Sequence, residues 1–182
     1  MIIGLTGKNA SGKGEVANYL KSKGFVYYSL SDVIREEATK RKLEHSRDNL
    51  INLGNELRTK FGSNYLAQQI NKKIKQQEKN KNFVIDSIRN PFEAKELMKN
   101  QNFVLIGIDA SIELRFKRLL ERNRVGDAKT LEEFKQQEER ENLKSDTNQQ
   151  LDATFGMANK VIVNDGSLEE LHKKIDKLLK NI

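Results

Sequence analysis

The 182-residue sequence contains no cysteine, only two histidines and no long hydrophobic run. Without cysteine, disulfides and thiolate metal sites are excluded. His45 and His172 lie in polar, helical surroundings and do not form a pair of metal ligands. The longest apolar runs, such as residues 103–108, are far too short to span a membrane. Because the chain enters its first expected strand at once, we expect no signal peptide and a soluble, cytoplasmic protein.

Basic side chains outnumber acidic ones, with 33 Lys and Arg against 26 Asp and Glu, so the net charge is +7. Such a surplus suits anionic partners but does not say which anion. Many of the lysines fall within residues 72–81, a run typical of a solvated helix end and loop. We therefore do not interpret this run as a surface for nucleic acid.

A phosphate-binding loop is predicted near the start of the chain. A short apolar run at residues 2–5 is followed by Gly7, and then by Gly12 and Lys13. This order of strand, glycine loop and helix is typical of a P-loop, whose N–H groups and helix dipole bind a polyphosphate. Lys13 is expected to reach the β- and γ-phosphates. The residues expected around the phosphates are Gly7, Lys8, Asn9, Ala10, Ser11, Gly12, Lys13, Gly14 and Glu15.

The two residues that follow Lys13 bear on how a metal ion could be held. Gly14 stands where the usual P-loop has Ser or Thr to hold Mg²⁺. Glu15 follows, and an acid at a helix N-terminus interacts favourably with the helix dipole. Glu15 could equally hold a water molecule of a magnesium shell. Both roles stay open at this stage.

Strands alternate with helices along the whole chain, which predicts an α/β fold with a parallel sheet and helices on both faces. The strands are expected to begin near Ile2, Phe25, Asn82, Phe103 and Lys160, and Ser31 and Asp32 are expected to cap the helix after the second strand. We expect a single domain over residues 1–182. Two insertions, about residues 31–77 and 123–147, hang from carboxyl ends of strands, where ligands bind in such sheets.

Two pairs of an acid and an arginine follow predicted strands. Asp32 and Arg35 lie three residues apart at a helix start, so they could bind an acceptor or simply form a cap and a surface salt bridge. Asp86 ends a buried strand, a position that commonly serves a magnesium shell through water, and Arg89 lies just beyond it. The alternative for the second pair is a strand-end turn whose arginine is tied to a helix.

A stripe of arginines lies farther along the chain. Arg115, Arg118 and Arg122 are one helical turn apart, so they repel one another unless an anion lies among them or Glu113 and Glu121 neutralise them. Arg124 and Arg140 follow in the second insertion.

Three motifs resemble those of adenylate kinase and related nucleoside monophosphate kinases. The Gly-Lys-Gly of the P-loop is similar to theirs, residues 30–35 resemble their Thr-Gly-Asp-Met-Leu-Arg, and residues 84–89 resemble a shortened Asp-Gly-Phe-Pro-Arg. The arginine stripe resembles the start of their lid. The resemblance implies a P-loop NTPase fold, a three-layer α/β/α sandwich with strand order 2-3-1-4-5. It also implies that Arg35 holds the acceptor's phosphate and that lid arginines close over the phosphates.

Other segments resemble dephospho-coenzyme A kinases, namely the opening Ile-Gly-Leu-Thr-Gly and, more loosely, residues 52–62. Arg58, in the second of these, is either an acceptor ligand or a surface arginine. The acceptor of such a kinase is a ribose hydroxyl, which benefits from a general base, and Asp32 could supply one.

Our interpretation is an ATP- and Mg²⁺-dependent kinase whose acceptor is a nucleoside or deoxynucleoside monophosphate. The expected catalytic residues are Lys13, Asp32, Arg89, Arg118 and Arg122, with Arg124 on the donor, Asp86 on the metal through water, and Asp32, Arg35, Arg58, Arg89 and Arg140 on the acceptor. Dephospho-coenzyme A kinase is the alternative, and a nucleotide-regulated RNA-binding protein ranks third because the aromatic residues mostly fall in expected cores. We expect a monomer or homodimer.

Overall fold

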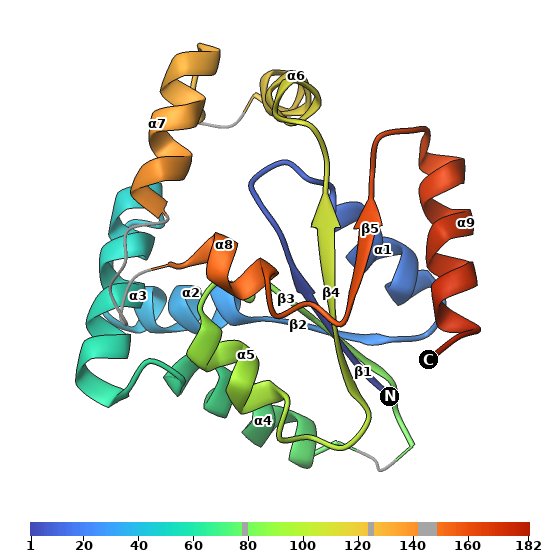
Figure 1. Ribbon diagram of the computed structural model, residues 1–182. Helices are drawn as coiled ribbons and strands as arrows, with labels where there is room; N and C mark the ends of the chain where they lie inside the picture. Colours follow the sequence, from blue (N-terminus) through green and yellow to red (C-terminus); the bar gives the residue numbers. More distant parts are fainter. Residues whose placement is uncertain (78–79, 124–125, 142–148) are drawn as a thin grey trace.

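Five parallel strands form the centre of the computed structural model, which describes residues 1–77, 80–123, 126–141 and 149–182 (Figure 1). Their order is β2-β3-β1-β4-β5, which confirms the predicted fold class and strand order. Val26 and Phe83 are the first paired residues of β2 and β3, one position after the predicted starts. The strands are β1 (Ile2–Thr6), β2 (Val26–Ser29), β3 (Phe83–Asp86), β4 (Phe103–Asp109) and β5 (Lys160–Val163).

Helices cover both faces of this sheet, and α6 and α7 lie above the carboxyl ends of the strands (Figure 1). In the described part of the chain the helices are α1 (Lys13–Ser22), α2 (Leu30–Lys40), α3 (Arg47–Phe61), α4 (Tyr65–Lys75), α5 (Pro91–Leu97), α6 (Ile112–Arg122), α7 (Leu131–Glu141), α8 (Leu151–Phe155) and α9 (Leu168–Leu179). Helices α2, α3 and α4 form the first predicted insertion, and α7 belongs to the second. The short α8 was not predicted.

The strands divide their side chains between two hydrophobic cores. In β1, Ile2 packs in the core shared with α2 to α5, whereas Ile3 and Leu5 pack in the core shared with α1 and α9. In β3, Val84 and Ile85 likewise point to opposite faces. Because helices cover both faces of a parallel sheet, its strands read as continuous apolar runs. This is why the apolar segments of the sequence located the strands so closely.

The start of α2 differs from the prediction. Its N-cap is Ser29, whose side-chain oxygen accepts a hydrogen bond from the N–H of Ser31 at 3.2 Å. The expected caps, Ser31 and Asp32, already lie in the first helical turn. The helix therefore begins directly at the carboxyl end of β2, which brings its first turn close to the ends of β1 and β3. Asp32 sits in that first turn, where its charge suits the helix dipole.

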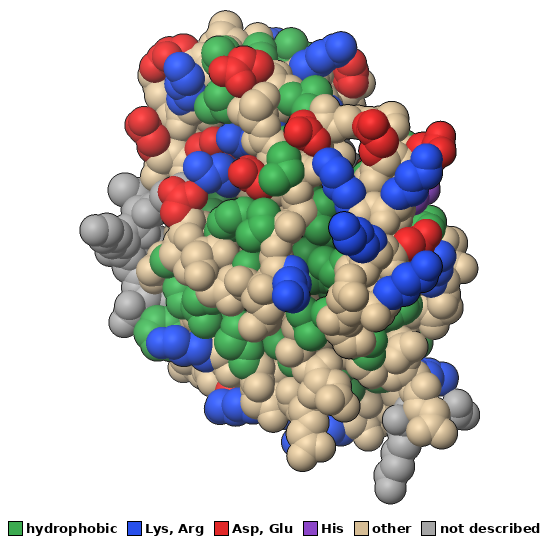
Figure 2. All heavy atoms as spheres, turned by 45° about the vertical axis from the view of Figure 1, so that its right-hand side comes forward, with side chains coloured by type: hydrophobic (Ala, Val, Ile, Leu, Met, Phe, Trp, Pro, Cys, Tyr) green, Lys and Arg blue, Asp and Glu red, His purple; other side chains and the backbone are tan. Residues whose placement is uncertain are grey.

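The face seen in Figure 2 bears on how the excess positive charge is distributed. Basic and acidic side chains are interspersed over the upper part of this face, and the basic ones lower down stand apart among hydrophobic and uncharged atoms. A protein that tracks a nucleic-acid backbone presents its Lys and Arg in a continuous stripe or patch. The coloured part of this face offers no such surface. Over the described residues, no helix has both the length and the apolar character needed to cross a membrane.

The two-core arrangement predicts a sharp contrast between two leucines. Leu20 of α1 is fully buried, whereas Leu120 of α6 is 47% exposed. Leu20→Ala removes methyl groups from a packed core, so it should lower the free energy of unfolding by about 2–5 kcal/mol. Leu120→Ala should change it by about 0.5 kcal/mol or less. Urea denaturation of both variants measures this, and equal shifts would contradict the assignment of the core.

Candidate active site

The loop between β1 and α1 is shaped by two glycines that no other residue could replace. Gly7 and Gly12 have φ angles of +138° and +103°, which side chains rarely tolerate. A Cβ atom on Gly7 would collide with the carbonyl oxygen of Ile108, at the end of β4, and one on Gly12 would collide with the amide of Asn164. The loop therefore presses closely against the ends of β4 and β5, and α1 begins at its edge with Lys13.

Lys13 closes the loop in this structure. Its Nζ donates hydrogen bonds to the carbonyl oxygens of Gly7 and Lys8, both at 2.7 Å. Its positive charge therefore lies at the centre of the loop, beside the N-terminus of α1. Both the helix terminus and the ammonium group attract an anion to this point.

Asn164 supports the loop from the far side, a role that the sequence analysis missed. Its Nδ2 donates to the carbonyl of Ser11 at 2.9 Å, and its backbone N–H donates to the carbonyl of Asp109 at 2.7 Å. Its own carbonyl accepts a bond from Nη2 of Arg118 at 3.0 Å. In sequence this residue looks like an ordinary turn asparagine, and no local signal marks its contact with a loop more than 150 positions away.

The guanidinium of Arg118 is consequently placed beside the phosphate-binding loop. Its Nη1 is buried and makes no hydrogen bond within the described part of the chain. Arg118 lines the same cleft as the loop. It is thus one of the predicted site residues that the fold brings to the expected place.

The other two arginines of the stripe, Arg122 and Arg115, are paired with acids. Arg122 donates two hydrogen bonds to the carboxylate of Asp127, both at 2.8 Å, and Nη1 of Arg47 lies 3.8 Å from the same carboxylate. Arg115 is buried, bonds the carbonyl of Asn9 at 3.3 Å and pairs with Glu138 of α7. Arg115 therefore links helix α7 to the backbone of the phosphate-binding loop.

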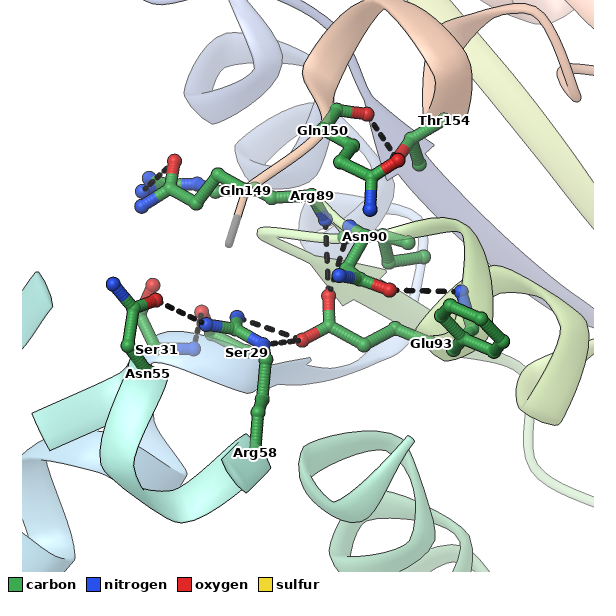
Figure 3. A network of polar contacts seen from close by, with 12 residues as sticks. Ser29, Ser31, Asn55, Arg58, Arg89, Asn90, Glu93, Gln149, Gln150 and Thr154 are labelled. Atoms are coloured by element: carbon green, nitrogen blue, oxygen red, sulfur yellow. Dashed lines mark hydrogen bonds and ion pairs between the residues drawn. The ribbon is translucent and has the colours of Figure 1, made fainter. Parts of the chain in front are cut away.

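Two of the predicted acceptor ligands, Arg35 and Arg58, are also held by acids, and Figure 3 shows the second of these pairs. Arg35 bonds Asp32 at 3.0 Å, and both side chains are about half exposed. Arg58, in contrast, is buried and donates through Nε and Nη2 to one oxygen of Glu93, at 3.0 and 2.8 Å. The prediction of a ligand or a surface arginine at position 58 did not foresee this buried pair.

Asp86 lies at the carboxyl end of β3, as predicted. One of its oxygens accepts the N–H of Ser87 at 2.6 Å, and the other lies 3.5 Å from the hydroxyl of Tyr27. Burial raises the pKa of Tyr27, and the charge of Asp86 raises it further. The Tyr27 hydroxyl therefore stays protonated at neutral pH and can donate toward the carboxylate. Arg89, just beyond, donates to the amide oxygen of Gln149 at 3.4 Å, so its partner there is uncharged.

These groups line one cleft of about 1080 Å³. Its walls include many of the predicted site residues, namely Gly7, Asn9, Ala10, Gly12, Lys13, Gly14, Glu15, Arg35, Arg58, Asp86, Arg89, Arg118 and Arg122. They also include residues that the sequence analysis did not single out, among them Tyr27, Arg47, Asp127, Gln149 and Asn164.

Four predicted site residues in the described part of the chain do not line the cleft, namely Lys8, Ser11, Asp32 and Arg140. Lys8 pairs with Asp152 at 3.2 Å, and Ser11 is buried beneath the loop. Asp32 is about half exposed and bonded to Arg35, and Arg140 is exposed on α7. Arg124 falls outside the described residues.

A metal ion would have to rely on few protein groups here. Within the described residues, no cluster of three or more His, Asp or Glu side chains could hold one. Gly14 has no hydroxyl to offer. Two carboxylates that line the cleft come from elements beside the P-loop. Glu15 lies in the first turn of α1, and Asp86 ends β3, the strand next to β1.

Comparison with known proteins agrees with this arrangement. A family model described as an AAA domain matches residues 6–135. A UPF0200 protein of Pyrococcus abyssi is 33% identical, over 100% of this chain and 97% of its own length. The chain belongs to the UPF0200 family. Among solved structures, TT1252 from Thermus thermophilus has a TM-score of 0.66 at 19% identity, covering 100% of this chain and 97% of its own.

A shikimate kinase from Acinetobacter baumannii has a TM-score of 0.58 at 14% identity, covering 99% of this chain and 93% of its own. At these identities the structural matches establish the fold alone. Together with the family model they give this UPF0200 member a P-loop kinase-like fold.

The packing of the loop predicts opposite effects for two glycines that lie two residues apart. Gly12→Ala adds a methyl group against the Asn164 amide at a positive φ, so it should destabilise the fold by more than about 1 kcal/mol. At Gly14 an added Cβ meets no atom within 4 Å. Because this residue is helical, Gly14→Ala should stabilise by about 0.5–1 kcal/mol. Thermal denaturation compares them, and a stable Gly12→Ala variant would refute the close packing.

Proposed function

We propose that the protein is a cytoplasmic, ATP-dependent phosphotransferase whose acceptor is a nucleoside or deoxynucleoside monophosphate. The observation that carries this proposal is the single cleft lined by the P-loop, Lys13 and arginines from opposite sides. Phosphoryl transfer needs positioning and charge neutralisation more than covalent chemistry by the protein. A cleft with cations on both sides is suited to two phosphate-bearing ligands.

The P-loop is the proposed donor site. The polyphosphate of ATP would lie against the loop backbone, and Lys13 would exchange its two carbonyl partners for phosphate oxygens. Arg118, with its unsatisfied buried Nη1, would then donate to the donor phosphates. The turn after β5, with Asn164, places a wall of the cleft beside the same loop.

The residues fit a magnesium ion that is held mainly by phosphate oxygens and water. Without a hydroxyl at Gly14, protein contacts would come through water from Asp86, with Glu15 as a second candidate. When bound, Mg²⁺ supplies charge neutralisation on the transferred phosphoryl group. The protonated Tyr27 hydroxyl would hold the Asp86 carboxylate toward this position.

Arg35 and Arg89 are the proposed acceptor ligands, with Arg47 added by the structure. Arg89 has a neutral partner in Gln149, so a phosphate can bind it without displacing a carboxylate. Arg58 lines the cleft, but its Nε and Nη2 are bonded to the buried Glu93, so we assign it to the wall of the cleft. Arg140 and Arg124 remain predictions for a lid that closes over both ligands.

A hydroxyl acceptor, as in dephospho-coenzyme A kinases or the shikimate kinases among the structural matches, is the second candidate. It would require a base near the transferred group. Asp32 is bonded to Arg35 and stands outside the cleft lining, so it is poorly placed for that task. Asp86 does line the cleft and is the better candidate for a base.

The donor site is tested by a coupled assay of ADP release with MgATP and a panel of ribo- and deoxynucleoside monophosphates, dephospho-coenzyme A and shikimate. At least one monophosphate should stimulate ADP release. Lys13→Ala should abolish that stimulation, because its ammonium group no longer binds the donor phosphates, while the circular dichroism spectrum stays unchanged. Undiminished turnover by this variant would contradict the proposal that the P-loop binds the donor phosphates.

Variants of the Asp32–Arg35 pair test whether the acceptor is a monophosphate held by Arg35 or a hydroxyl that uses Asp32 as its base. For a monophosphate, Arg35→Ala should raise the acceptor KM strongly with little change in the affinity for ATP, because a charge-assisted contact is lost. Asp32→Asn should then have a small effect. For a hydroxyl acceptor that uses Asp32 as its base, Asp32→Asn should instead lower kcat by roughly 10²–10⁴-fold.

Arg41→Ala is the matched control, since Arg41 lies at the other end of α2 and pairs with Glu37 and Glu56 away from the cleft. It should leave both kinetic constants unchanged. A melting curve of Asp32→Asn is needed as well, because Asp32 also sits in the first turn of α2.

A further inference from the structure

The carboxylate of Glu93 joins two parts of the cleft wall that are distant in sequence (Figure 3). Its Oε1 accepts both bonds from Arg58 of α3, at 3.0 and 2.8 Å. Its Oε2 accepts the backbone N–H groups of Arg89 and Asn90, at 3.1 and 3.2 Å. One side chain thus holds the acceptor-side helix α3 and the segment that carries Arg89.

This carboxylate is completely buried, and the side chain of Arg58 is only 4% exposed. A buried ion pair is weak evidence for a role in stability, because well-packed apolar residues often do as well or better. The four hydrogen bonds that Glu93 accepts instead fix the positions of the Arg58 side chain and of the backbone at residues 89 and 90. They fix the backbone of Arg89 relative to α3.

The segment held by Glu93 is otherwise attached to the sheet. Ser87 has a φ of +64°, an unusual conformation for a serine, and the carbonyl of Ile88 accepts a bond from Thr6 at 2.9 Å. The carbonyl of Arg89 accepts the N–H of Gln150 at 2.8 Å. These bonds fix the backbone around Arg89. Its side chain lines the cleft and donates to Gln149.

Helix α3 presents one face to the same cleft. Arg47, Leu50, Gly54 and Arg58 line it at spacings of three or four residues, as one helical face requires. A ligand that moves α3 would therefore pull on Arg58 and, through Glu93, on the backbone of Arg89.

We propose that Glu93 and Arg58 are positioning residues that set Arg89 in the cleft and couple its placement to helix α3. The proposal rests on the proposed phosphotransfer, in which Arg89 contacts the acceptor and the transferred group. Neither residue touches the ligands. Their contribution is the placement of the Arg89 guanidinium.

Glu93→Gln tests this directly. Glutamine keeps the shape but has one acceptor oxygen, so it cannot serve Arg58 and the two backbone N–H groups together. With MgATP and the monophosphate that gives the fastest ADP release, kcat should fall by about 10²-fold, the cost of misplacing a group by about 1 Å. Binding of a fluorescent ADP analogue at the P-loop should not change.

A double-mutant cycle with Arg89→Ala separates positioning from a general loss of structure. If Glu93 acts through Arg89, Glu93→Gln should cost little further activity once Arg89 is alanine. Glu96→Gln is the matched control, because Glu96 lies one turn along and bonds Asn64 and Lys99 without contacting the Arg89 segment. It should leave kcat unchanged. Losses from Glu93→Gln and Arg89→Ala that multiply would overturn the proposal.

Hydrogen–deuterium exchange gives a second measurement that needs no turnover. In Glu93→Gln, the amides of Arg89 and Asn90 should exchange about tenfold faster than in the wild type or Glu96→Gln, since one hydrogen bond is worth about that factor. Exchange that stays unchanged would refute the positioning. If no acceptor supports turnover by the wild type, the proposed function fails, yet this measurement still decides the role of Glu93.

Arg58→Met/Glu93→Gln covers the case in which the single variant does not fold. It removes both buried charges, so neither is left uncompensated. Glutamine can then serve the Arg89 segment, while the connection to α3 is lost. We expect near-normal exchange at the amides of Arg89 and Asn90 together with a reduced kcat. A normal kcat in this variant would show that coupling to α3 has no functional role.

Discussion

The close contact between the phosphate-binding loop and the ends of β4 and β5 is the constraint on which the site depends. Gly7 passes against the carbonyl of Ile108, and Gly12 passes against the Asn164 amide, with no room for a side chain at either point. This contact sets where α1 begins and where its N–H groups point. It also places Arg118 beside the loop, because the same Asn164 accepts its hydrogen bond. Loop, helix terminus and arginine thus share one support.

A second feature is the pairing of cations with acids around the cleft. Asp32, Glu93, Asp127 and Glu138 each hold an arginine, and two of these pairs, those of Glu93 and Glu138, join different helices. Burying a charge without a partner is costly, so the arginines that are removed from water all have one. Arg89 and Arg118 differ, because Arg89 donates to the amide of Gln149 and Arg118 to the backbone carbonyl of Asn164. The proposed reaction uses both of these arginines with neutral partners on the phosphates.

The sequence was sufficient for the fold and for the loop because both depend on local patterns. Apolar runs buried on two faces located the strands, and the spacing of Gly7, Gly12 and Lys13 located the loop. The Asn90–Glu93 spacing also carried a capping-box signal that was overlooked. No local pattern could have paired Arg58 with Glu93, or Arg115 with Glu138, because the choice of partner depends on how distant helices pack. For the same reason the role of Asn164 was visible only in the folded chain.

The shared carboxylate of Asp127 has a consequence for the kinetics of ligand exchange. It bonds Arg122 of α6 and lies near Arg47 of α3, so it bridges these two helices. A phosphate arriving at Arg122 would replace one ion pair by another, and its net gain would be only the difference between them. In the proposed reaction, such exchange would lower the affinity for phosphate at Arg122 and would therefore shorten the residence time of a charged product. It also weakens the long-range attraction of the cleft for anions, because the cation is already neutralised before the ligand arrives.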